Sequence, residues 1–414
     1  SKVLIAFKMN EKTTLIKSPG ELTERFINQT NRSVFLTGKA GTGKTTLLKK
    51  IIETTHKNTV VVAPTGIAAL NAGGVTIHSF FQLPFGGFLP VMGQAPHISD
   101  RVKLNTQSTM QRHFRMNKQR QAIIRNLELL IIDEVSMLRA DLLDAIDFSL
   151  RKVRRSSDPF GGVQVLFIGD LLQLPPIVKP EEKAVLSKYY NGFFFFHAKA
   201  LERVPPLYVE LEKIYRQDDE EFIEILNHLR NNFIDQKDVD VLNKYVKPDF
   251  KPSEHEGYIT LTTHNNKADQ INQRSLDAIK GKSNKYKAEI TGDFPPNIFP
   301  IAEEMELKVG AQVMFIKNDD TANGDRRWVN GTIGHVIDFP SSGGVVVEAE
   351  GEELQVGYAS WEKIRYEVEE DFDEATNTTK EKLVPVTVAE FKQIPLRLAW
   401  AVTIHKSQGQ TYVE

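Results

Sequence analysis

A glycine-rich segment near the start of the chain has the residue types that bind phosphate. Gly38-Lys39-Ala40-Gly41-Thr42-Gly43-Lys44-Thr45 follows a β-branched run at 34–37 and precedes a helical pattern at 45–53. Glycines let successive backbone N–H groups turn inward around an anion, and a helix N-terminus favours negative charge. Lys44 would place its charge on the outer phosphates of a nucleotide, while the Thr45 hydroxyl would ligate Mg²⁺. A chance glycine-rich turn is the alternative, and the flanking strand and helix make it the weaker one.

Two adjacent carboxylates follow another strand-like run. Residues 129–132 are Leu-Leu-Ile-Ile, and Asp133 and Glu134 come directly after them. The carboxyl ends of parallel strands meet at one edge of a sheet, so we expect both acids beside the phosphate loop. Asp133 would hold the Mg²⁺ shell, and Glu134 would act as the general base on the attacking water. The two acids could instead cap the helical segment at 136–142, but beside a phosphate loop we favour the catalytic interpretation.

Two further polar residues are candidates for sensing the terminal phosphate. Gln173 follows the strand-like run at 165–168 and Gly169-Asp170, where it could donate to that phosphate or satisfy the turn before Pro175. Arg216 follows a break at Pro205-Pro206 and could reach across a cleft as an arginine finger, or be an ordinary surface arginine. The residues alone leave both questions open.

Hydroxyls, imidazoles and aromatic rings near expected strand ends could contact the phosphates and bases of a single strand. Phe80 could instead belong to the core, and His78 could be a structural histidine; taken singly, such structural alternatives are favoured. A basic run at 101–127 is likewise best interpreted as a solvated helix face. The candidate strand-binding residues are Pro64, Thr65, Gly66, His78, Phe80, Thr263, His264, Asn265, Thr403, His405 and Lys406.

The bulk composition limits the class of protein. The 414 residues are 41% hydrophobic and 26% charged, with a net charge of −2 and no cysteine. Several cores can be buried, disulfide and thiolate chemistry is excluded, and no apolar run approaches the roughly 20 residues that a membrane span needs. The net charge is opposite to that of a protein that coats duplex DNA, so any nucleic-acid site must be local. We expect a cytoplasmic protein, or a nuclear or mitochondrial one if it is eukaryotic.

The order of the expected elements predicts an α/β fold with insertions. Unalternated apolar runs at 34–37, 59–62, 129–132 and 165–168 are typical of buried parallel strands, and helical patterns at 45–53 and 141–151 would cover them. After an N-terminal segment at 1–21, we expect a first α/β domain at 22–199 with an insertion at about 75–118. The Gly-Gly pair within 84–90 predicts a tight, protruding hairpin there.

A second α/β domain is expected at 200–293. Closely spaced strand-like runs at 294–389 predict a small β-barrel, and helical character at 400–406 indicates that this barrel is inserted before a return segment at 390–414.

Taken together, these segments resemble superfamily-one helicases that move 5′ to 3′, most closely the Pif family, which is related to RecD. The resemblance covers most of the chain. Its specific parts are Gly38 to Thr46, Ala63-Pro64-Thr65-Gly66-Ile67-Ala68-Ala69, Ile77-His78-Ser79-Phe80-Phe81, Leu130 to Met137, Gly169 to Pro176, Leu211 to Gln217 with Phe222 to Asn227 and Leu229-Arg230, and Trp400 to Thr411.

The resemblance implies two RecA-like P-loop domains with ATP and Mg²⁺ between them and Arg216 acting from the opposite domain. It implies an insertion in the first domain that carries a strand-separating wedge, and an SH3-like β-barrel in the second. The expected partners are single-stranded DNA, forked or 5′-tailed duplex and G-quadruplex DNA, bound by a monomer. The implied nucleotide-binding residues are Gly38, Gly41, Thr42, Gly43, Lys44, Thr45, Thr46, Gln408 and Gly409, and the implied wedge residues are Phe85, Phe88 and Leu89.

The family's sixth motif, with its second arginine, would lie beyond Glu414, and we expect the native chain to continue there. Two other functional classes stay open from sequence. One is an ATP-gated clamp that holds a single strand without unwinding a duplex. The other comprises phosphate-loop kinases and RNA-directed helicases. No lid or acceptor pocket of a kinase is evident in the sequence. DNA and RNA stay undistinguished, because residue spacing does not reveal how a protein contacts the sugars of a nucleic acid.

Overall fold

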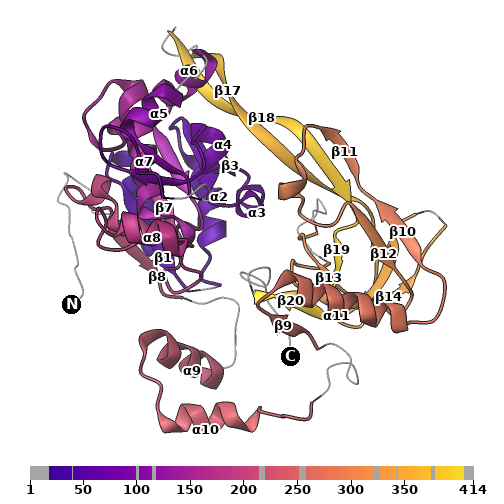
Figure 1. Cartoon of the computed structure of the whole chain (residues 1–414). Coiled ribbons are helices and arrows are strands. Elements are labelled where there is room, and N and C mark those ends of the chain that lie inside the picture. The colour runs from indigo at the N-terminus through magenta and orange to yellow at the C-terminus, as the bar shows by residue number, and fades with distance from the viewer. Residues whose placement is uncertain are drawn as a thin grey trace, which may run out of the picture. The chain divides into compact units, whose positions relative to one another are not determined.

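The computed structural model describes residues 18–39, 41–98, 102–113, 118–213, 220–250, 258–319, 327–341, 343–373 and 378–404. The chain forms two compact units (Figure 1). Unit 1 comprises Ser1–Pro64, Ile77–Tyr215 and Val368–Leu383, and unit 2 comprises Thr65–Thr76, Arg216–Glu367 and Val384–Glu414. Each unit is compact in itself.

A parallel sheet forms the centre of unit 1. Its strands β2, β6, β7, β1 and β8 lie side by side in that order, and all four pairings are parallel. The side chains of β1, β6 and β7 are buried throughout, because helices cover both faces of a parallel sheet. This confirms the four predicted strands. Their bounds are β1 Val34–Gly38, β2 Thr59–Ala63, β6 Leu129–Ile132, β7 Gln164–Ile168 and β8 Leu207–Leu211.

Helices of unit 1 pack around this sheet with conventional end signals. Ser18 caps the first helix by accepting the Glu21 N–H at 3.2 Å, and Pro19 occupies its first turn, where a missing N–H costs nothing. The two helices predicted at 45–53 and 141–151 are confirmed as α2 and α7. The helices of unit 1 are α1 Pro19–Gln29, α2 Lys44–Thr54, α4 Ile77–Phe81, α5 Gln107–His113, α6 Lys118–Asn126, α7 Ala140–Arg154 and α8 Pro180–Leu186.

The buried face of α7 carries carboxylates that hold neighbouring loops. Asp144 accepts the backbone N–H groups of Lys199 and Ala200 at 3.1 and 2.9 Å. Asp147 Oδ1 accepts the Phe160 N–H at 2.6 Å. Asp147 Oδ2 forms an ion pair with Arg151 Nε at 2.8 Å. Buried carboxylates are tolerated only with such partners, so this helix ties loops to the sheet by charge-assisted hydrogen bonds.

The hairpin predicted within 84–90 is wrong. β4 (Gly87–Leu89) pairs in parallel with β5 (Leu104–Thr106), and a parallel pair cannot be joined by a tight turn. A Cβ on Gly86 would lie 2.2 Å from the Lys103 carbonyl oxygen. The Gly-Gly pair therefore serves the close approach of two backbones rather than a turn.

In unit 2, a small parallel pair carries the α/β character. β9 (Thr260–Thr262) pairs with β20 (Ala401–Thr403), and the helix α11 (Asn265–Ala278) packs beside both. The helix predicted at 400–406 is therefore wrong at 401–403, where the buried side chains of Ala401 and Val402 favour a covered strand. The other elements here are α3 Gly66–Asn71, β3 Val75–Thr76, α9 Glu220–Asn231 and α10 Gln236–Lys244.

The closely spaced strands predicted after residue 294 are confirmed as an antiparallel sheet. Its order is β16-β15-β14-β13-β19, and its core includes Val313, Phe315, Trp328, Val347 and Leu396. The strands are β13 Gln312–Phe315, β14 Ile333–Asp338, β15 Val345–Ala349, β16 Glu352–Val356 and β19 Leu396–Leu398. The remaining strands are β10 Asn284–Lys287, β11 Glu289–Gly292, β12 Glu304–Leu307, β17 Ala359–Asp373 and β18 Thr378–Gln393. None of the described helices is long and apolar enough to cross a membrane.

Candidate active site

The glycine-rich loop connects β1 to α2 with the backbone geometry that an anion site needs. Gly41 and Gly43 have φ values of 76° and 86°, in the left-handed region that other residues avoid. Helix α2 begins at Lys44 without a side-chain cap. The N–H groups of its first turn are therefore available to phosphate oxygens.

Two contacts fix the start of the loop. The Thr42 hydroxyl, on a side chain that is 3% exposed, donates to the Lys39 carbonyl oxygen at 2.9 Å. A Cβ on Gly38 would lie 2.6 Å from Thr42 Oγ1 and 2.7 Å from the Leu211 carbonyl oxygen. Glycine is required at position 38 because β8 and the loop approach its backbone closely.

Lys44 closes the loop from inside. Its Nζ donates to the carbonyl oxygens of Gly38 and Lys39 at 2.6 and 2.9 Å. The ammonium group thus lies over the loop where an outer phosphate would be held. Thr45 and Thr46 are exposed in the same helical turn, so the Thr45 hydroxyl is accessible to a ligand.

Asp133 and Glu134 extend β6 at the same edge of the sheet. The Asp133 N–H continues the ladder by donating to the Val62 carbonyl oxygen at 2.9 Å, and Asp133 Oδ1 accepts the Glu134 N–H at 2.9 Å. Glu134 has φ 51°, a left-handed conformation that is uncommon in a non-glycine residue. Such a strained backbone conformation is typical of functional sites.

The electrostatics connect the loop to the acids. Burial, together with the neighbouring Asp133 and Asp170, raises the pKa of Glu134 to about 7, although Lys44 opposes them. Burial also raises the pKa of Asp133, and Lys44 again lowers it. The structure therefore brings four charged residues close enough to interact electrostatically: Lys44, Asp133, Glu134 and Asp170. The first three were predicted to lie together. A carboxylate with a pKa near neutrality is suited to general base work.

Gln173 lies in the turn after β7. Its Nε2 is 3.4 Å from Asp170 Oδ2, and Asp170 Oδ1 also accepts the Leu172 N–H at 3.1 Å. Asp170 is 3% exposed and was not predicted as a site residue. Its position at a parallel strand's carboxyl end, directly after Gly169, was the signal that could have identified it.

The strand-binding candidates of unit 1 differ in accessibility. Phe80 is 2% exposed and packs edge-on against Phe81 at 4.8 Å, so its expected role in base stacking is corrected to a core role. His78 is half-buried and stacks on Phe85 at 5.4 Å. Burial and then Arg139 lower the pKa of His78, and Asp141 opposes them. Pro64 is half-buried directly after β2.

Of the three expected wedge residues, only Phe85 is accessible, at 77% exposure. Phe88 and Leu89 are 3% and 0% exposed, so they cannot separate strands and are corrected to core residues. An ion-pair cluster that sequence reasoning missed holds them in place. Arg139 pairs with Asp141 and Glu182 at 2.8 Å each, and Asp141 Oδ2 also accepts the Phe88 N–H at 2.9 Å.

The strand-binding candidates of unit 2 lie near α3 and the N-terminus of α11. Thr65 caps α3 by accepting the Ala68 N–H at 3.2 Å, and a Cβ on Gly66 would lie 2.3 Å from Ile298 Cγ2. Thr403 Oγ1 donates to Asn265 Oδ1 at 3.3 Å, which brings two candidates from distant parts of the sequence together.

Thr263 and His264 are exposed beside Asn265, and Thr263 Oγ1 lies 2.7 Å from His264 Nδ1. Five of the predicted site residues lie outside the described residues: Arg216, His405, Lys406, Gln408 and Gly409.

Comparisons with known proteins identify relatives of this chain. A family model described as PIF1-like helicase matches residues 16–88 and 87–240. The chain is 33% identical over 389 residues to "ATP-dependent DNA helicase PIF1" of Homo sapiens, covering 92% of this chain and 53% of that protein. It is 28% identical over 394 residues to "ATP-dependent DNA helicase Pif1" of Campylobacter jejuni, covering 92% and 81%. The chain thus spans about half the length of the vertebrate relatives that it matches.

Solved structures give the same result. The fold is similar to Bacteroides sp Pif1 in complex with ADP-AlF4, with a TM-score of 0.82, 36% identity and coverage of 97% of this chain and 85% of that chain. It is also similar to Bacteroides Pif1 bound to ssDNA, with a TM-score of 0.57, 37% identity and coverage of 97% and 85%. With a family model over more than half of its length and a structural relative matched over most of both chains, this chain belongs to the PIF1-like helicase family.

Proposed function

We propose that this protein is an ATP-dependent DNA helicase that moves 5′ to 3′ along a single strand and acts as a monomer. The observation that carries the proposal is the electrostatic interaction of Lys44 with Asp133 and Glu134. These residues lie beside a phosphate loop whose glycines have left-handed backbone conformations. The names of the relatives and the ADP-AlF4 and ssDNA complexes of Bacteroides Pif1 support it.

The residues at this edge of the sheet divide the hydrolytic work. Lys44 would exchange its two carbonyl partners for oxygens of the outer phosphates. The Thr45 hydroxyl and the Asp133 carboxylate are hard oxygen donors of the kind that Mg²⁺ prefers, so these two residues would hold the ion, which supplies charge neutralisation on the phosphates. Glu134 would accept the proton of the attacking water, for which its pKa of about 7 is suited.

Motion would come from the two units, which we propose to be RecA-like domains. ATP would close them by engaging Lys44, Gln173 and Arg216 together, and hydrolysis would let them reopen, with Gln408 and Gly409 adding nucleotide contacts. A ligand shifts such an equilibrium only by the contacts that it makes in one state and not in the other. Arg216 would supply that difference by reaching the phosphate from the second domain.

Strand contacts would come from both units. We propose that one part of the single strand is bound by Pro64, Thr65, Gly66 and His78. Phe85 would act as the wedge, because it is the accessible member of the three predicted residues. We propose that the antiparallel sheet β16-β15-β14-β13-β19 belongs to an SH3-like barrel. The other part of the single strand would be bound by Thr263, His264, Asn265, Thr403, His405 and Lys406.

A strand-displacement assay tests this function. With ATP and Mg²⁺, we expect release of the labelled strand from a 5′-tailed duplex and little release from a 3′-tailed duplex of the same sequence. A forked duplex and a 5′-tailed G-quadruplex should also be opened, and an RNA-tailed duplex should not. ATP hydrolysis without displacement from any substrate would contradict the helicase function and favour an ATP-gated clamp.

A further inference from the structure

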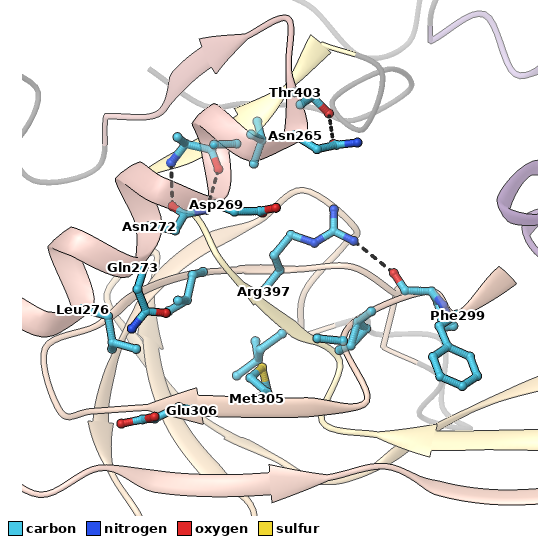
Figure 2. A pocket seen from close by; sticks show the side chains of 18 of the residues that line it. Asn265, Asp269, Asn272, Gln273, Leu276, Phe299, Met305, Glu306, Arg397 and Thr403 are labelled. Carbon is cyan, nitrogen blue, oxygen red and sulfur yellow. Dashed lines mark hydrogen bonds between the residues drawn. The ribbon is translucent and has the colours of Figure 1, made fainter. Parts of the chain in front are cut away.

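The two units fix their candidate strand contacts by different means. In unit 2 the contacts are polar: Thr403 Oγ1 donates to Asn265 Oδ1 at 3.3 Å, and Asn272 is hydrogen-bonded to the backbone of β20 (Figure 2). In unit 1 an aromatic ring is exposed instead, that of Phe85. A ring that separates strands must keep its orientation while it pushes on the duplex, so its supports decide whether it can act as a wedge.

The chain between His78 and Phe85 turns back sharply. Helix α4 ends at Phe81, and Gln82 follows with φ 50°, a left-handed conformation that is uncommon for residues other than glycine. The Leu83 N–H then donates to the His78 carbonyl oxygen at 3.2 Å. This turn directs the chain back along α4 and brings Phe85 beside His78.

One face of the Phe85 ring is covered by an imidazole. The centroids of the His78 and Phe85 rings lie 5.4 Å apart, and their planes differ by 21°, which is a stacked arrangement. His78 is half-buried in α4 and offers a fixed base, whereas most of the Phe85 ring faces solvent. An aromatic stack contributes a free energy similar to that of one base-pair step in DNA. The contact is therefore strong enough to influence whether the ring or the base pair yields.

The backbone around Phe85 is held independently of its ring. Asn105 Nδ2, on a side chain that is 8% exposed, donates to the Phe85 carbonyl oxygen at 3.2 Å. The Gly87 N–H donates to the Lys103 carbonyl oxygen at 3.0 Å, and a carboxylate of α7 accepts the Phe88 N–H at 2.9 Å. With the main chain fixed, the ring can move only by side-chain rotation. Among the ring contacts of the described residues, the stack on the half-buried imidazole limits that rotation.

We propose that His78 is a positioning residue for strand separation, whose imidazole holds the Phe85 ring in the orientation that parts the duplex. This inference rests on the proposed function, because it takes Phe85 as the wedge of a helicase. It goes beyond a strand contact by His78, since a side chain that only bound the strand would act alike with or without the Phe85 ring. Loss of the imidazole should therefore lower the number of base pairs opened per ATP.

A double-mutant cycle on 5′-tailed duplex DNA tests this dependence. The variants are His78→Ala, Phe85→Ala and the protein that carries both changes. Strand displacement and ATP hydrolysis are measured in the same reaction, and their ratio gives the base pairs opened per ATP, which corrects for weaker binding of the strand. His78→Phe restores a ring without imidazole nitrogens. His56→Ala, which removes an exposed imidazole between α2 and β2, is the matched control.

We expect His78→Ala to lower this ratio about three- to tenfold, as the loss of one aromatic stack would. In Phe85→Ala, which has no ring to hold, the same change should lower the ratio no further. His78→Phe and His56→Ala should keep the ratio of the unmodified protein. His78→Leu fills the space without a ring, should behave as His78→Ala does, and replaces it if that variant does not fold.

Two results would overturn the inference while the helicase function stands. One is an unchanged ratio in the variants that lack a ring at position 78. The other is an equal loss with and without the Phe85 ring, or a loss in His78→Phe, because His78 would then act on the strand and not on the ring. If the unmodified protein displaced no strand from any substrate, the proposed function itself would fail.

Discussion

The Lys44 ammonium nitrogen lies 2.6 Å from the Gly38 carbonyl oxygen, so the loop that would hold a triphosphate is closed by its own lysine. A second bond, to the Lys39 carbonyl oxygen at 2.9 Å, completes this arrangement. Both bonds are charge-assisted and keep the ammonium group satisfied before a ligand arrives. Nucleotide binding would then be an exchange of hydrogen-bond partners by Lys44.

The two glycines at the ends of this loop should respond differently to alanine. Gly43→Ala introduces strain only, at φ 86° with open space for a Cβ, and we expect a loss of about 1 to 2 kcal/mol in nucleotide binding. Gly38→Ala brings a Cβ within 2.7 Å of the Leu211 carbonyl oxygen and should be the more damaging change. Titration with a fluorescent ATP analogue measures both. Tighter binding by Gly38→Ala than by Gly43→Ala would contradict the role of the close approach.

Glu134→Gln should separate ATP binding from hydrolysis. The amide cannot accept the proton of the attacking water, so we expect hydrolysis to fall by roughly 100- to 10,000-fold while ATP affinity changes little. Single-turnover hydrolysis and equilibrium binding measure the two effects. Glu53→Gln, an exposed change on α2, is the control and should hydrolyse ATP normally. Normal turnover in Glu134→Gln would assign the general base elsewhere.

Asp144 should make unit 1 less stable as the pH rises from about 4 to about 6. Burial raises the pKa of Asp144 from 3.8 to about 6, although hydrogen bonds from Ala200 and Lys199 oppose this. Within that window the folded protein retains a proton that the unfolded chain has lost, so the free energy of unfolding falls, by on the order of 3 kcal/mol in total.

Denaturant unfolding at several pH values measures this effect of Asp144. Asp144→Asn should remove the corresponding part of the pH slope, even though the loss of one acceptor lowers its stability at every pH. The exposed control Asp158→Asn should keep the slope of the unmodified protein. An unchanged slope in Asp144→Asn would show that the carboxyl does not titrate in this window.

The corrected wedge assignment predicts opposite phenotypes for two phenylalanines. Phe85→Ala removes an exposed ring and should lower strand displacement about tenfold while leaving stability and DNA-stimulated ATP hydrolysis near normal. Phe88→Ala removes a ring that is 3% exposed and should cost about 3 to 5 kcal/mol of stability. Displacement assays and thermal unfolding distinguish the two. A Phe85→Ala protein that unwinds normally would refute the wedge.

The sequence predicts the parallel strands and the nucleotide site because their signals are local. The run at 129–132 and the two acids after it are adjacent, and the strand's burial follows from its unalternated apolar residues. The failures involve distant partners. β4 lies beside β5, and β20 lies beside β9, pairings that no local pattern reports. Phe80 is an aromatic residue whose burial depends on what packs around α4.

The site residues that sequence reasoning missed act through charge in three dimensions. Asp170 enters the site through its effect on Glu134, which depends on the order of β6 and β7 in the sheet. Arg139 and Asp141 hold the Phe88 backbone, and only the fold reveals that this ion pair is buried and lies beside β4. Sequence spacing identifies which residues could react, whereas the burial and the charges around them are known only from the packed structure.

The most direct test of the nucleotide site is DNA-stimulated ATP hydrolysis by Lys44→Ala. The account predicts a fall of roughly 100-fold or more, because no other group replaces this charge on the phosphates. Lys49→Ala, on the exposed face of the same helix, should hydrolyse ATP at the normal rate. Near-normal hydrolysis by Lys44→Ala would mean that ATP is bound elsewhere and would contradict the account.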